Sequence, residues 1–261
     1  MIRTRGFSLV ELSIVLVILG LLTGGILAGQ SLIRASELRS ISTQYQTYVT
    51  AVQSFRDKYQ ALPGDMRNAT SFWGALHATP ATCYAMASSS ALTCNGDGNG
   101  VVATQGSGAD TAYERFRFWQ HLANGGLLEG QYTGYTGPGG SMVDSIPGLN
   151  VPRGRIGNSG WVVGTVSAVP GASTLVYSII YGQFLLFGAT ATNTETNGAL
   201  LKPEEVWNID TKLDDGRPAR GKIIVRFWDQ CTTSASETDL AGEYLLTETG
   251  NLCSMYFTSV F

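Results

Sequence analysis

The sequence predicts an α+β fold, in which one long N-terminal helix packs on a mainly antiparallel β-sheet. Two observations support this prediction. A helical pattern runs from Phe7 to about Ala61 without proline, and the strand-like segments all come after it. A helix first and strands later is typical of α+β proteins. The 261 residues are enough for one membrane segment and one globular domain, or two small ones.

The first part of this helix has the length and composition of a membrane span. Residues 7–29 are apolar except for Glu11 and three hydroxyl side chains. As a helix they extend roughly 34 Å, which exceeds a bilayer core of about 30 Å. Arg3 and Arg5 precede the span, so the positive-inside rule predicts a cytoplasmic N-terminus and an exported remainder.

A cleaved secretory signal peptide is the alternative for this segment. Such a peptide has a short apolar region followed by a cleavage site of small residues, which Ala28-Gly29-Gln30 weakly imitates. The apolar run is long enough to span, however, and it continues into a second helical pattern without proline or a turn. Both features favour a retained helix.

Glu11 is the unusual residue of the span, because a carboxylate near the start of a membrane helix is costly. A cut between Gly6 and Phe7 creates an α-amino group four residues before Glu11. The amine and the carboxylate then lie on one helical face and can pair within a subunit or between staggered neighbours. The alternative is a carboxylate that reaches the lipid headgroups.

The segment Arg5-Gly6-Phe7-Ser8-Leu9-Val10-Glu11-Leu12, followed by the apolar run, resembles the type IV prepilin signature. Type IV pilins and the pseudopilins of type II secretion share this signature, and the resemblance covers about the first 35 residues. It implies a pilin-like fold and cleavage after Gly6 by a prepilin peptidase on the cytoplasmic side. It further implies N-methylation of Phe7, and a role for Glu11 in registering a new subunit against a neighbour's Phe7 amine.

The resemblance also implies partners and a location. The partners are other pilin or pseudopilin subunits, a prepilin peptidase, the inner-membrane assembly platform and membrane lipid. The chain is expected to cross the bacterial inner membrane once, with its C-terminal domain in the periplasm, and then to enter a pilus or pseudopilus. A net charge of -3 gives no sign of nucleic-acid binding.

The second part of the helix is amphipathic. Its apolar residues recur at alternating steps of three and four: Leu38, Ile41, Tyr45, Tyr48, Val52, Phe55 and Tyr59. The stripe is short and rich in tyrosine, which favours packing on the chain's own β-sheet over a coiled-coil seam. Pro63-Gly64 ends the helix near Ala61.

These observations divide the chain into four parts. They are a leader peptide, a transmembrane or filament-core helix, an amphipathic helical spine and an extracytoplasmic globular α+β domain, at residues 1–6, 7–29, 30–61 and 62–261. Gly24-Gly25 and Gly29 weaken the helix. They serve either close helix packing or a local loosening during assembly.

The globular part is expected to hold short helices and later strands. Asp65 is expected to cap a short helix carrying Phe72 and Trp73. Thr111 and Glu114 form a capping box that opens a helix with one apolar side, closed by Gly125-Gly126. Another helix starts at Pro203, and residues 130–160 form loops. Strands are expected at Trp161–Val166, Leu175–Phe187 and Ile223–Trp228, with a last edge strand at Tyr256-Phe257.

Four cysteines, an even number in an exported chain, favour two disulfides. They are Cys83, Cys94, Cys231 and Cys253, and they allow three connectivities. We expect the sequential pairing, with four reduced thiols as the alternative.

Enzymatic and metal-binding motifs are weak, so the sequence predicts no catalytic residue, no metal site and no cofactor. Residues 95–100, Asn-Gly-Asp-Gly-Asn-Gly, resemble the start of a calcium loop, but the glutamate expected at the twelfth position is absent. Asp210, Asp214 and Asp215 form a second acidic cluster, for which turn chemistry suffices and calcium binding is the alternative. Gly157-Asn158-Ser159-Gly160 lacks the partners of a protease serine.

The sequence is compatible with three functions. The leading one is a structural subunit of a type IV pilus or a type II secretion pseudopilus, with a domain large enough for a minor or specialised subunit. The second is a minor pilin that acts as a binding module for adhesion, DNA uptake or contact with a secreted protein. The third, a membrane-tethered hydrolase, has no catalytic constellation to support it.

Overall fold

The computed structural model describes residues 8–102, 114–139, 141–166, 176–226 and 230–261. The chain divides into two compact units, residues 1–40 and residues 41–261. One long helix contributes to both units. Among the described residues, a four-stranded antiparallel sheet and four shorter helices belong to the second unit, so the predicted α+β class is confirmed.

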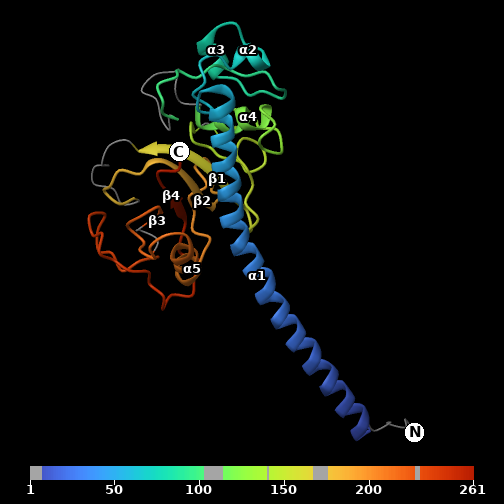
Figure 1. Ribbon diagram of the computed structural model, residues 1–261. Coiled ribbons are helices and arrows are strands. Elements are labelled where there is room, and N and C mark those ends of the chain that lie inside the picture. The colour runs from blue at the N-terminus through green and yellow to red at the C-terminus, as the bar shows by residue number, and fades with distance from the viewer. Residues whose placement is uncertain (1–7, 103–113, 140, 167–175, 227–229) are drawn as a thin grey trace. The chain divides into compact units, whose positions relative to one another are not determined.

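Helix α1, Leu9–Tyr59, is continuous from the first unit into the second (Figure 1). Gln60 follows it with a φ of 53°, and its N–H donates to the Arg56 carbonyl at 2.8 Å. Pro63 lies three residues further on and cannot continue a helix. The predicted end of the helix near Ala61 is confirmed.

The amphipathic half of α1 packs on the globular unit. Ile41, Val52 and Phe55 are fully buried. The Tyr45 ring stacks on Phe257 with centroids 4.3 Å apart, and Tyr48 meets tryptophans edge to face. The apolar stripe therefore faces the chain's own sheet, as its tyrosine content predicts.

The sheet has the strand order β1-β2-β4-β3, and each neighbouring pair is antiparallel. The strands are β1 Ser159–Val166, β2 Gly182–Ala189, β3 Ile223–Val225 and β4 Met255–Phe257. The prediction of an edge strand at Tyr256-Phe257 is wrong, because β4 pairs with β2 on one side and β3 on the other. All three of its residues are buried, as an interior strand requires.

The strand boundaries differ from the predicted ones for local reasons. β1 begins at Ser159, two residues before Trp161. β2 begins only at Gly182, whose φ of 62° follows a turn, so the predicted strand from Leu175 starts too early. β3 ends at Val225, and Trp228 lies outside the described residues.

Helix α4, Glu114–Asn124, is present where predicted but is buried on every side. Its expected apolar residues are buried, and so is its polar side, because Arg115, Arg117 and His121 hydrogen-bond within the fold. Gly126, with a φ of 72°, ends the helix as predicted. The expected cap at Thr111 lies outside the described residues.

Two short helices lie between α1 and α4 in the sequence. They are α2, Thr70–Trp73, and α3, Pro80–Tyr84, of which α3 was not expected. Contrary to the prediction, Asp65 does not cap α2. Its carboxylate instead accepts the N–H groups of Asn99 and Gly100, both at about 3 Å. It thereby holds the 95–100 loop.

Helix α5, Pro203–Leu213, begins at the predicted proline and ends before Asp214. The Lys202 N–H donates to the Glu205 carboxylate at 3.0 Å, which satisfies a backbone donor at the start of the helix.

Candidate functional site

The N-terminal half of α1 exposes a continuous apolar surface. Every described residue from 8 to 28 is exposed, including the large side chains of Leu9, Val15 and Leu22. Its length and mean hydropathy of 2.4 suit a membrane crossing. A soluble protein rarely leaves so much apolar area uncovered, so this surface is a candidate for lipid or neighbouring subunits.

Polar side chains in this segment bond to their own helix. The Ser13 hydroxyl donates to the Val10 carbonyl at 2.9 Å, and the Thr23 hydroxyl donates to the Leu19 carbonyl at 2.9 Å. Each hydroxyl therefore has a hydrogen-bond acceptor even when the helix lies in an apolar environment. Glu11 is then the one ionisable side chain from residue 8 to residue 33.

Ser8 and Glu11 form a reciprocal capping box at the start of α1. The Ser8 hydroxyl accepts the Val10 N–H at 3.2 Å and lies 3.4 Å from the Glu11 nitrogen. In return, the Glu11 carboxylate accepts the Ser8 N–H at 2.9 Å. This arrangement satisfies backbone donors that have no partner within the helix. The Ser-x-x-Glu spacing is visible in the sequence, although the cap was not among our predictions.

The capping box lies directly beside the predicted cleavage site. Gly6 and Phe7 themselves lie outside the described residues, so their roles and the register role of Glu11 stay predictions. The carboxylate of Glu11 points back to the backbone N–H of Ser8, the first described residue.

The glycines of the exposed segment leave its surface open. A methyl group added at Gly20, Gly24, Gly25 or Gly29 would meet no other atom within 4 Å. The helix runs through all four without interruption. Such small residues allow close approach of a neighbouring helix.

The globular unit is cross-linked by two disulfides, Cys83–Cys94 and Cys231–Cys253. Their Cα atoms lie 5.9 Å and 5.2 Å apart, within the usual range for such bonds. The first bond links α3 to the chain before residue 95, and the second encloses the C-terminal loop before β4.

His121 is a buried structural residue. Its Nδ1 accepts the Gly64 N–H at 3.0 Å, so the proton is on Nε2, which donates to the Thr93 hydroxyl at 2.9 Å. Thr93 in turn donates to Gln120 at 2.7 Å. Burial, reinforced by the charge of Arg117, lowers the His121 pKa to about 3. His121 is therefore neutral, and its hydrogen bond to Gly64 holds the Pro63-Gly64 turn against α4.

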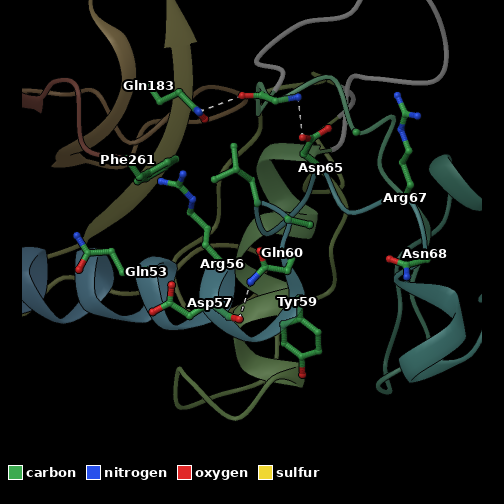
Figure 2. Close-up of a pocket in the computed structure, with 14 residues that line it drawn as sticks. Gln53, Arg56, Asp57, Tyr59, Gln60, Asp65, Arg67, Asn68, Gln183 and Phe261 are labelled. Carbon is green, nitrogen blue, oxygen red and sulfur yellow. Dashed lines mark hydrogen bonds between the residues drawn. The ribbon is translucent and has the colours of Figure 1, made fainter.

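A polar cavity of about 850 Å³ lies beside the end of α1 (Figure 2). Arg56 and Asp57 come from α1, and Arg67 comes from the segment before α2. Arg67 donates to the Asp97 carbonyl at 2.6 Å. Neither arginine forms a salt bridge among the described residues.

Asp65, at the wall of this cavity, gathers with Asp97 and Glu114. One carboxylate oxygen from each lies within 4.8 Å of the others. Burial is the main cause that raises the Asp65 pKa to about 6. Backbone and side-chain N–H groups of residues 97–100 occupy oxygens of all three acids. The fold brings them together from distant parts of the chain, and sequence inspection missed this group.

Asp210, Asp214 and Asp215 also converge, with carboxylate oxygens within 4.8 Å of one another. Asp210 is fully buried and accepts the Tyr244 hydroxyl at 2.7 Å. Burial, aided by the two neighbouring aspartates, raises the Asp210 pKa to about 7.

Candidates for other chemistry do not assemble. Ser159 is fully buried in β1, so it is not available as a nucleophile. His77 is exposed on a turn, and neither carboxylate cluster in the described part of the chain includes a histidine.

Comparison with known families and proteins identifies only the N-terminus. Residues 1–27 match the prokaryotic N-terminal methylation motif. Comparisons with curated proteins and with solved structures gave no match. The match covers the predicted cleavage site, Glu11 and most of the exposed apolar segment.

Proposed function

We propose that this chain is a structural filament subunit, made as a type IV pilin- or pseudopilin-type precursor, because its N-terminus matches the prokaryotic N-terminal methylation motif. The filament is a type IV pilus or a type II secretion pseudopilus. The size of the 41–261 unit supports a minor or specialised subunit. The single observation that carries the proposal is the methylation motif on an uncovered apolar helix.

Processing is the first step of the proposed mechanism. A prepilin peptidase cuts after Gly6 on the cytoplasmic side, and the new Phe7 amine is methylated. The Ser8–Glu11 capping box supports this step, because Glu11 already reaches the backbone at residue 8. Ser8 directly follows Phe7 in the sequence, and the Phe7 amine becomes positively charged after the cut.

Assembly is the second step. The exposed face of residues 9–33 leaves the bilayer and packs against the same face of neighbouring subunits, and the open glycines admit close approach. A carboxylate in this apolar bundle needs a cationic partner, since an unpaired buried charge costs several kcal/mol. The Phe7 amine of a neighbour supplies it and sets the stagger between subunits.

The globular unit coats the filament on the periplasmic side. Two disulfides and a closed hydrogen-bond network suit an exported domain. In this arrangement the arginines before the span stay in the cytoplasm until the leader is removed.

The proposal is tested with two variants of Glu11. Glu11→Gln keeps an oxygen that can accept the Ser8 N–H but removes the charge, whereas Glu11→Ala removes both. We expect both variants to insert into the membrane normally and both to fall by at least tenfold in the sheared filament fraction. Immunoblots of membrane and filament fractions measure this.

The matched control is Ser13→Ala, which removes a hydroxyl from the same part of the helix without touching a charge. It should enter filaments at the normal level. Normal filament levels of Glu11→Gln would show that the cap, and not the charge, matters, and would contradict the register role.

The polar cavity supports an alternative function, in which the chain is a binding module on a filament. Two arginines without salt bridges among the described residues, beside amide and aromatic side chains, suit a polar ligand. Arg56→Ala with Arg67→Ala should then leave filaments intact but abolish attachment to a surface or secreted protein. Unchanged attachment would remove this function.

A further inference from the structure

The polar cavity at the end of α1 offers two cationic side chains to a ligand. Arg56 comes from the last turn of α1 and Arg67 from the segment before α2, and both are exposed. In the described part of the chain, neither of them forms a salt bridge. In the view of Figure 2 they lie on either side of Asp65. Two separate cations in one cavity suit an elongated ligand that carries more than one negative charge.

Arg67 is held in place before any ligand binds. Its Nε donates to the Asp97 carbonyl at 2.6 Å, which leaves the two terminal nitrogens of the guanidinium group for a ligand. Gly98, with a φ of 66°, lies against this side chain, and a methyl group added there would overlap it. A side chain that is already positioned loses less conformational freedom when it binds.

The loop that positions Arg67 is itself fixed by three side chains. Glu114 accepts the Asp97 N–H at 3.0 Å, and the Gln183 amide donates to the Gly100 carbonyl at 3.3 Å. Asp65 holds the same loop through its two backbone hydrogen bonds. This wall of the cavity is therefore formed in the free protein, as in most small-molecule sites.

The rest of the lining suits a ligand that is rich in hydroxyl groups. Primary amides can both donate and accept hydrogen bonds, and Asp57 can accept them. The half-buried ring of Phe261 adds an apolar surface. The amides are those of Gln53, Gln60 and Asn68. A sugar has the matching groups, since its hydroxyls donate and accept while its C–H groups pack on a ring.

We infer that this cavity binds a short stretch of an acidic polysaccharide, with one uronic-acid carboxylate on each arginine. This inference rests on the binding-module function proposed above and names its ligand class. A guanidinium group holds a carboxylate through two parallel hydrogen bonds. Asp57 and the chain's net charge of -3 oppose nucleic acid, whose phosphates carry charge more densely, whereas the Asp57 carboxylate can accept sugar hydroxyls.

The test titrates the full chain with trigalacturonate by calorimetry, in a detergent without a sugar headgroup. We expect one site per chain, and binding of the neutral trisaccharide maltotriose that is at least tenfold weaker. Arg56→Ala and Arg67→Ala should each weaken trigalacturonate binding at least tenfold. Added sodium chloride should weaken it as well, because salt screens exposed charges.

Two further variants separate a shaped site from general attraction between charges. Arg67→Lys keeps the charge but loses the planar fork, and Gly98→Ala displaces Arg67 without removing any charge. Both should weaken binding at least tenfold, and circular dichroism checks that both fold. The matched control is Arg217→Ala, at an exposed arginine outside the cavity, which should keep full affinity.

No heat with trigalacturonate, equal binding of maltotriose, or unchanged affinity in Arg67→Ala would overturn the inference. Tighter binding of a single-stranded oligonucleotide than of trigalacturonate would overturn the ligand class. These titrations need no filament, so their failure leaves the subunit role standing. If trigalacturonate fails while the double arginine variant still loses attachment, the ligand class is wrong and the binding module stands.

Discussion

At the residue scale, two polar side chains have well-defined hydrogen-bond partners that fix their geometry. Glu11 is tied to the Ser8 backbone, and His121 is tied to Gly64 and Thr93. Both act through the geometry of their hydrogen bonds. Only the first lies within the N-terminal motif.

His121 makes the globular unit sensitive to acid. Its pKa is about 3 in the folded state and about 6.5 when unfolded, so below pH 6.5 the unfolded state binds a proton that the folded state does not. Its contribution to stability is therefore complete above pH 6.5 and decreases as the pH falls, by at most about 1.4 kcal/mol per pH unit. Protonation of Nδ1 would also replace the Gly64 hydrogen bond by a contact between two donors.

His121→Phe tests this, because the variant keeps a ring but cannot take up a proton. The variant should be less stable at pH 7, and the difference in free energy of unfolding from the natural chain should narrow between pH 6.5 and pH 4. Urea unfolding at several pH values measures it. His77→Gln, at an exposed turn, serves as the control, and a constant difference for His121→Phe would rule out the neutral histidine.

At the element scale, periodicity predicted α1 and its stripe, because both follow from local sequence. The interior position of β4 in the sheet was not predictable, because strand order depends on pairing between distant segments. The burial of the polar side of α4 was not predictable for a similar reason. Arg115 and Arg117 look exposed in the sequence, but their partners come from residues 195 and 83.

The stripe of α1 should carry much of the stability of the globular unit. Phe55 is fully buried and packs against Tyr59 and Trp73, with centroids 4.5 Å and 6.2 Å away. We expect Phe55→Ala to lower the free energy of unfolding by about 3–5 kcal/mol, as for other buried phenylalanines. Chemical denaturation of the detergent-solubilised chain measures this value.

The control for Phe55→Ala is Gln53→Ala, on the exposed side of the same helical turn. Its effect should stay within about 0.5 kcal/mol. Equal effects of the two substitutions would mean that the amphipathic half does not dock through its stripe.

At the scale of the whole molecule, the part of the chain up to the end of α1 was more predictable than the rest. The span, its acid and the long helix are local features of the sequence. Asp65, Asp97 and Glu114 converge from three separate segments, and Tyr244 meets Asp210 across 34 positions. Such groups depend on tertiary packing, so sequence spacing does not indicate them.

The account of function depends on an acid in an apolar helix that gains a cationic partner only after the leader is removed. Intact-mass spectrometry of the chain isolated from sheared filaments tests this most directly. We predict a polypeptide that begins at Phe7 and carries one N-terminal methyl group. A polypeptide that still begins at Met1, or that begins near residue 30, would contradict the account.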